Sequence, residues 1–157
     1  MLASLRSRRG FSLIELVIVV LILGIIAAIA VPRMSRGAKG AQESSVASNL
    51  ASLRNAIDLY YTEHGDYPDL AKFSDQLTTF SDATGKTQAT KDATYIYGPY
   101  IRAIPALPVG TDKGSKVVAS SGSPGDGTGW IYIEATGVIS ANTGSLADEA
   151  GKLFSSY

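Results

Sequence analysis

The chain contains no cysteine, and His64 is the only histidine among its 157 residues. These absences exclude disulfide bonds, a cysteine nucleophile, thiolate metal sites and histidine metal clusters. His64 itself is interpreted as a helix cap or a surface side chain. Basic and acidic side chains balance at 14 each, so the charge gives no reason to expect nucleic-acid binding. With no catalytic set in the sequence, we expect a protein that is not an enzyme.

Residues 11–31 form an apolar run in which Glu15 is the one charged residue. As a helix with a rise of about 1.5 Å per residue, these 21 residues would extend over about 31 Å. This length matches the hydrocarbon thickness of a bilayer. The run therefore predicts a single membrane-spanning helix, which follows the basic residues Arg6, Arg8 and Arg9.

Glu15 is the residue that needs an explanation, because an ionised carboxylate at membrane depth costs roughly 2.5 to 3.5 kcal/mol. Cleavage between Gly10 and Phe11 would create a cationic amine four residues before Glu15. Within one helix the two groups are about 6 Å apart along the axis, so the amine of a parallel neighbouring helix, shifted by one or two turns, reaches Glu15 more directly. A pair at about 4 Å gains about 4 kcal/mol at an effective dielectric near 20. Repeated head to tail, this stagger builds a helical filament.

Two simpler interpretations of the run are a secretory signal peptide and an ordinary membrane anchor. A signal peptide would explain the arginines, and it would explain Ala28 and Ala30 as the small residues of a cleavage site at positions 28–30. Its apolar core, residues 16–31, is slightly long for that purpose. Neither interpretation gives Glu15 a role.

Residues 8–16, with the sequence Arg-Arg-Gly-Phe-Ser-Leu-Ile-Glu-Leu, resemble the class III leader junction of type IV prepilins and of the pseudopilins of type II secretion. The resemblance implies a leader peptide at residues 1–10, cleavage between Gly10 and Phe11, and N-methylation of Phe11 by a prepilin peptidase. It also implies that the subunit forms a helical homopolymer on an inner-membrane assembly platform, with Glu15 acting in assembly.

The apolar helix is expected to continue beyond the membrane. Residues 11–32 form the transmembrane and polymerisation helix, and residues 33–64 continue it as an amphipathic helix. Pro32 removes a helix hydrogen bond and should kink or loosen the helix, with Gly24 as a second weak point. Alternatively, Pro32 only marks the exit from the membrane.

Apolar residues recur at spacings of three and four after residue 42, which predicts one buried helix face. They are Val46, Leu50, Leu53, Ile57, Tyr60 and Tyr61. Gly65 and Pro68 should end the helix. Asp69 is predicted to cap a short second helix, with an apolar side formed by Leu70, Phe73, Leu77 and Phe80.

The rest of the chain is predicted to be loop and strand. Residues 81–94 are polar and predict a loop, and residues 95–97, 116–119, 130–134 and 138–141 predict strands. A turn at Thr136 and Gly137 makes residues 130–141 a hairpin, and Gly125–Gly129 is interpreted as another turn. Asp148 and Glu149 are assigned to a solvated helix face.

The expected fold is α+β: a long N-terminal helix packed on a small antiparallel sheet, the type IV pilin-like lollipop, with residues 65–157 as its globular head.

Residues 49–68 and 98–105 resemble the corresponding segments of major pseudopilins, although residues 107–110 depart from the pattern of that family. Major pseudopilins tend to bind calcium near the sheet, which makes Asp112 and Asp126 candidate ligands. Calcium takes six to eight oxygen ligands, so two carboxylates are few, and a solvated loop without metal or other cofactor is the alternative.

The function expected from these residues is that of a structural filament subunit. One candidate is the major pseudopilin of a type II secretion system, which drives protein export together with minor pseudopilins. The other is a type IV pilin for adhesion, motility or DNA uptake. Many such pilins close their C-terminal region with a disulfide, which this chain cannot form. Either subunit is expected to span the inner membrane once, with its head in the periplasm, and to assemble into a periplasmic or extracellular filament.

Overall fold

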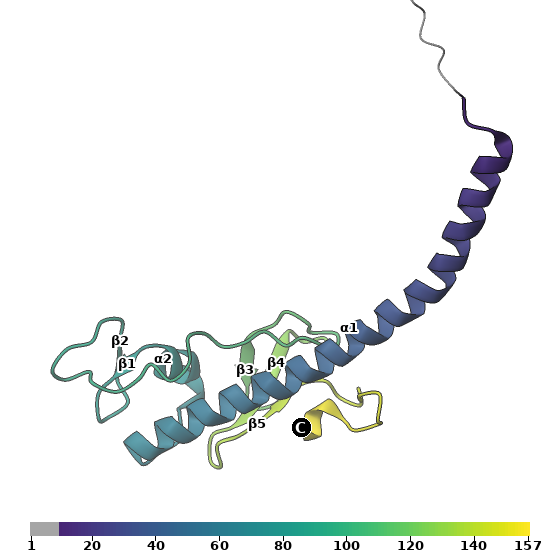
Figure 1. Ribbon diagram of the computed structural model, residues 1–157. Coiled ribbons are helices and arrows are strands. Elements are labelled where there is room, and N and C mark those ends of the chain that lie inside the picture. Colours follow the sequence, from purple (N-terminus) through teal and green to yellow (C-terminus); the bar gives the residue numbers. More distant parts are fainter. Residues whose placement is uncertain (1–9) are drawn as a thin grey trace, which may run out of the picture. The chain divides into compact units, whose positions relative to one another are not determined.

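In the computed structural model the described residues are 10–157, without the side chains of residues 31, 32 and 34–36 (Figure 1). The expected leader, except for Gly10, therefore lies outside the described residues. The chain divides into two compact units between Ala38 and Lys39. Helix α1 (Leu13–His64) contributes its first part to one unit and its last part to the other.

The first part of α1 is apolar on every side. Its helix begins at Leu13 and is continuous through Gly24 and Pro32, so the kink expected at these two residues stays a prediction. None of the side chains in Leu13–Ala30 is buried, and the mean hydropathy of this segment is 3.1. The helix is thus long and apolar enough to cross a membrane.

The last part of α1 buries one face in the second unit. This face consists of Val46, Leu50, Leu53, Ala56, Ile57 and Tyr60, each at most 3 % exposed. The predicted stripe is confirmed except at Tyr61, which is 44 % exposed. Tyr61 stacks instead on Tyr67, with 4.4 Å between the ring centroids, because it lies one residue beyond the buried stripe and faces the turn that follows the helix.

The chain reverses where α1 ends. Gly65 has a φ of 80°, and its N–H donates to the carbonyl of Tyr61 at 2.8 Å, which confirms the predicted glycine cap. A 3₁₀ turn, η1 (Leu70–Lys72), leads into α2 (Phe73–Thr78). Asp69 caps this pair as predicted, since its carboxylate accepts the N–H of Ala71 at 2.9 Å. This bond lowers the pKa of Asp69.

The segment after α2 differs in part from the prediction. Phe80 was placed on the side of the second helix but begins strand β1 (Phe80–Ser81), which pairs antiparallel with β2 (Thr87–Gln88). The predicted loop at 81–94 therefore contains a two-residue strand. The strand predicted at 95–97 is wrong, apart from an isolated bridge between Ser81 and Tyr97. The interstrand bonds come from segments too short to show a period-two pattern in the sequence.

A second sheet has the order β3 (Val117–Ala119), β4 (Thr128–Ile133) and β5 (Val138–Ala141). Trp130 lies opposite Ala141 in the antiparallel pair β4–β5, which confirms the predicted hairpin, although β4 begins at Thr128. The expected antiparallel arrangement is wrong at β3, which runs parallel to β4. Parallel neighbours require a connection that returns along the sheet, and residues 120–127 make this return.

The helix stripe and the inner face of the second sheet share one core. Trp130 and Tyr132 are fully buried beside Ile139, and their polar atoms bond to loop carbonyls: Trp130 Nε1 donates to Pro105 at 2.8 Å, and the Tyr132 hydroxyl donates to Pro68 at 2.9 Å. Loops on both sides are thereby fixed to the sheet. The α+β fold class, a long N-terminal helix followed by small sheets, is confirmed.

The C-terminal segment is closed without a covalent bond. Ala147 and Leu153 form an isolated bridge, and the Tyr157 hydroxyl donates to the Asp148 carboxylate. This hydrogen bond lowers the pKa of Asp148 and raises the pKa of Tyr157 to about 12. The helix predicted around Asp148 and Glu149 is wrong: these residues form a turn, in which Asp148 accepts the N–H of Lys152.

Replacement of Leu53 tests the shared core. Leu53 is 0 % exposed, whereas Leu59, on the same helix, is 49 % exposed. We expect Leu53→Ala to lower the free energy of unfolding of the second unit by about 2 to 5 kcal/mol, because it removes buried methyl groups and leaves a cavity. Leu59→Ala should lower it by less than about 1 kcal/mol. Denaturant unfolding followed by Trp130 fluorescence measures both, and equal losses would contradict the packing described here.

Candidate functional site

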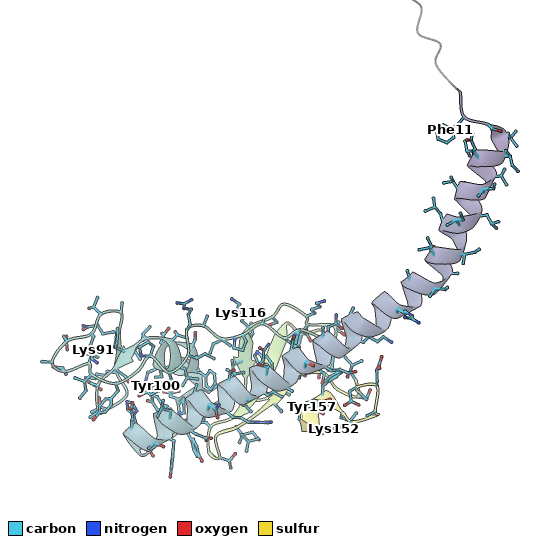
Figure 2. The ribbon with its side chains drawn as sticks, in the orientation of Figure 1. Phe11, Lys91, Tyr100, Lys116, Lys152 and Tyr157 are labelled. Atoms are coloured by element: carbon cyan, nitrogen blue, oxygen red, sulfur yellow. The ribbon has the colours of Figure 1, made fainter. Side chains whose placement is uncertain are left out.

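The start of α1 contains the residues predicted for processing and assembly. Gly10 and Phe11 are exposed and lie outside the helix, and Phe11 is 81 % exposed. The first helical bond runs from the Leu16 N–H to the Ser12 carbonyl at 3.2 Å. The bond between Gly10 and Phe11 is thus in non-helical, accessible backbone. Figure 2 shows Phe11 at this end of α1.

Glu15 has a partner that the sequence analysis missed. Its Oε2 atom accepts the backbone N–H of Ser12 at 2.7 Å. Ser12 and Glu15 are three residues apart, at the N-cap and third helical positions, so this contact is one half of a capping box. The signal was present in the sequence as Ser-x-x-Glu. A cation is therefore not the only group that can satisfy this carboxylate, contrary to the argument from membrane depth alone.

The capping bond also fixes where the carboxylate lies. It holds Glu15 at the positive end of the helix dipole, which stabilises the negative charge. Among the described residues, only one of its two oxygens accepts a hydrogen bond. The other oxygen remains free to accept a bond from an amine or another donor.

Among the described residues, nothing covers the apolar surface around this carboxylate. In the segment Leu13–Ala30 no side chain is buried, and Figure 2 shows side chains projecting on both sides of this part of α1. A helix that is apolar all round is normally surrounded by lipid or by other helices. The arrangement thus combines an unshielded apolar helix with one oriented carboxylate at its first turn.

Of the calcium candidates, Asp126 lies in the loop that returns from β3 to β4, and Asp112 lies in the segment before β3. Asp112 accepts the N–H groups of Gly125 and Gly127 at 2.6 and 2.9 Å. Asp126 accepts those of Ser123 and Thr128, each at 2.8 Å, and these bonds lower its pKa. The described residues include no group of three or more histidine, aspartate and glutamate side chains that could hold a metal. In this geometry the two carboxylates brace the return loop.

His64 joins the end of α1 to the small sheet. Its ring nitrogens lie 3.1 Å from the carbonyls of Tyr60 and Asp82, and its ring stacks on Tyr60 with 4.0 Å between centroids. The nearby Tyr100 hydroxyl donates to Glu63 at 2.5 Å; burial and this carboxylate raise the pKa of Tyr100. His64 is half-buried, so it acts as a structural link at the helix end, in line with the cap interpretation.

The comparisons with known proteins bear on the N-terminal segment. Residues 5–31 match the family model of the prokaryotic N-terminal methylation motif. No curated protein and no solved structure matches the chain significantly. The motif match supports a type IV prepilin-like subunit, a class of structural proteins that a prepilin peptidase processes and that assemble into filaments. Together with the apolar helix, it indicates a chain anchored in the membrane by a single span.

Replacement of Asp112 tests the bracing of the return loop. We expect Asp112→Asn to destabilise the second unit by about 1.5 to 3 kcal/mol, because an amide NH₂ group cannot accept the N–H that one carboxylate oxygen now accepts. Thermal unfolding with and without calcium measures the effect. A large calcium-dependent rise in the unfolding midpoint of the unchanged protein, absent in Asp112→Asn, would show that Asp112 binds a cation instead.

Proposed function

We propose that this chain is the structural subunit of a pilus-like filament. Its leader would be cleaved between Gly10 and Phe11, and the new Phe11 amine methylated. The observation that carries the proposal is the oriented carboxylate of Glu15 at the first turn of an apolar helical segment, Leu13–Ala30, in which no side chain is buried. Such a helix buries its surface by packing against identical helices, and the carboxylate determines how far neighbouring copies are displaced.

The proposed contact is an ion pair between the free oxygen of Glu15 and the Phe11 amine of the next copy. An isolated charge at membrane depth costs several kcal/mol, whereas a close pair recovers much of that cost. The pair forms only when the two helices are displaced by about one turn. It therefore selects one register from the many that apolar packing alone would allow.

Within this class we favour the major pseudopilin of a type II secretion system, which drives protein export. The resemblance of residues 49–68 and 98–105 supports this choice. So does the C-terminal segment, which is closed by the Tyr157–Asp148 hydrogen bond where many type IV pilins have a disulfide. The head would then lie in the periplasm, and the partners would be a prepilin peptidase, an inner-membrane platform, minor pseudopilins and other copies of the chain. The role is structural and requires no cofactor.

Two substitutions of Glu15 separate its two contacts. Glu15→Gln keeps an acceptor for the Ser12 N–H but removes the charge, whereas Glu15→Val removes both. We expect both variants to be inserted in the membrane and cleaved. Mass spectrometry checks this expectation and should find mature chains that begin with methylated Phe11. We expect neither to form filaments, because neither can form an ion pair with an amine.

The outcome that contradicts this proposal is specific. Normal filaments from Glu15→Gln, observed by electron microscopy of sheared or overexpressing cells, would mean that Glu15 acts only as a helix cap. A mature chain that begins after residue 30 would instead identify the apolar run as a signal peptide.

Deletion of the gene distinguishes the two filament roles. A major pseudopilin is needed for export, so we expect the deletion strain to retain exported enzymes in its periplasm and to keep its twitching motility and DNA uptake. Complementation with the unchanged gene should restore export, and the Glu15→Val gene should not. Normal export with loss of surface pili would assign the chain to the type IV pilins.

A further inference from the structure

We propose a second ionic contact between copies of this chain, in which Lys39 of one copy binds Glu43 of the next at the mouth of a pocket beside α1. The inference rests on the proposed filament and adds a contact outside the apolar segment. It concerns the part of α1 that belongs to the second unit, where Lys39 is the first residue.

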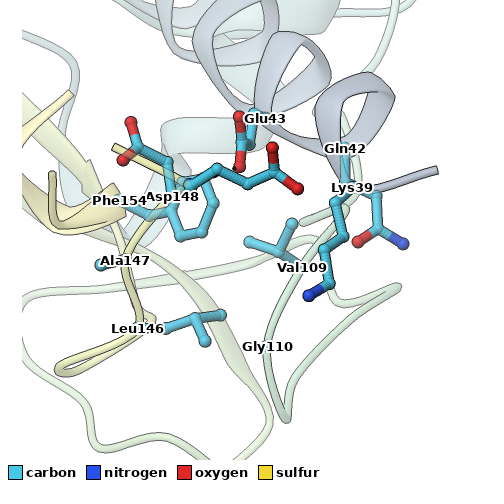
Figure 3. Close-up of a pocket in the computed structure, with 10 residues that line it drawn as sticks. Lys39, Gln42, Glu43, Val109, Gly110, Leu146, Ala147, Asp148 and Phe154 are labelled. Atoms are coloured by element: carbon cyan, nitrogen blue, oxygen red, sulfur yellow. Dashed lines mark hydrogen bonds between the residues drawn. The ribbon is translucent and has the colours of Figure 1, made fainter. Parts of the chain in front are cut away.

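The pocket has an apolar floor and a negative rim. It has a volume of about 260 Å³ and lies between α1 and the C-terminal segment (Figure 3). Val109, Leu146 and Phe154 form its apolar part. Its charged side chains are those of Lys39, Glu43, Asp148 and Glu149. Three carboxylates against one ammonium leave a surplus of two negative charges, which favours an incoming cation with an apolar stem, such as a lysine side chain.

Glu43 is held in place but only partly used. One of its oxygens, Oε1, accepts the N–H of Glu149 at 2.8 Å, and among the described residues its other oxygen accepts no hydrogen bond. This is the same state as that of Glu15, in which one oxygen is bonded locally and one is free. A half-buried carboxylate fixed in this way can bind a cation with little further ordering.

Lys39 does not neutralise Glu43 within its own chain. Lys39 is exposed, and in the part of the chain that the structure describes it lies within 4.0 Å of no carboxylate. Figure 3 shows its ammonium group directed away from Glu43. Since Lys39 precedes Glu43 by four residues on one helix, an internal pair would also have the less favourable orientation relative to the helix dipole.

The spacing in the sequence connects this contact with the one at Glu15. Phe11 precedes Glu15 by four residues, and Lys39 precedes Glu43 by four residues. When two parallel copies of a helix are displaced along the helix direction, every residue is displaced by the same distance. A displacement of four residues that brings the Phe11 amine of one copy beside Glu15 of the other therefore also brings Lys39 beside Glu43. No acidic residue occurs between Glu15 and Glu43, whereas Arg33, Arg36 and Lys39 are basic. The first carboxylate that follows this basic stretch in the sequence is therefore Glu43, and in the proposed filament Lys39 meets the Glu43 of a displaced copy.

Charge reversals test the pairing in the full-length chain. In Lys39→Glu the contact becomes two carboxylates, and in Glu43→Lys it becomes two ammonium groups. We expect each variant alone to reduce filament yield about tenfold or more, because like charges then face each other at every subunit contact. Glu43→Gln keeps the acceptor for the Glu149 N–H and is the matched control, with an intermediate yield expected.

Co-expression of the two reversed chains provides the decisive measurement. If Lys39 and Glu43 pair between copies, an alternating copolymer has opposite charges at every contact, and the filament yield should return to near that of the unchanged chain. Pairing within a chain, or misfolding of either variant, predicts no recovery. Two outcomes would overturn this contact and leave the proposed function standing. One is that the unchanged chain forms filaments but the mixture of reversed chains does not regain its filament yield. The other is a normal filament yield from Lys39→Glu alone. Failure of the unchanged chain to form filaments would overturn both.

Discussion

The uncovered apolar surface of the first part of α1 is the constraint on which the rest of this molecule depends. Over Leu13–Ala30 no side chain is buried, and apolar surface in water costs about 25 cal/mol per Å². Lipid or other helices must cover this surface. Apolar packing has no direction and sets no register, so any definite arrangement of copies must come from the few polar groups on the helix. Glu15 is the first of these groups, and Glu43 is the next acidic one.

One helix thus meets two environments, and its sequence changes accordingly. Up to Ala30 the apolar residues surround the helix, whereas from Val46 onward they form a single face that packs on the sheet. The core of the second unit needs only this face, because Trp130 and Tyr132 cover it from β4. The opposite face carries short polar side chains such as Ser45 and Ser52, whose hydroxyls donate to carbonyls four residues earlier. The head can therefore fold on the helix while that side stays available to neighbours.

Local patterns in the sequence predicted the elements that depend on local forces. The helix stripe, its glycine cap at Gly65, the Asp69 cap and the hairpin at β4–β5 each arise from residues close in the chain. The parallel pairing of β3 could not be predicted, because it joins β3 to β4 across a return segment that itself donates two N–H groups to Asp112, 13 and 15 residues earlier in the chain. Tyr61 was wrongly predicted to lie in the core, because helical spacing alone does not distinguish a buried contact from stacking on Tyr67. The Ser12–Glu15 cap is predictable from the Ser-x-x-Glu spacing, because it too joins residues close in the chain.

The two contacts of Glu15 support one another in the proposed filament. An ion pair in a low-dielectric environment gains most when its members are ordered before they meet. The Ser12 N–H orients the Glu15 carboxylate at 2.7 Å in the separate chain, so assembly has to order only the incoming amine. An aspartate at this position would be one methylene shorter and would reach the same N–H less well, which weakens the cap and moves the free oxygen toward the backbone. The length of the glutamate side chain is thus what allows one carboxylate to cap the N-terminus of its own helix and to set the register of the neighbouring helix.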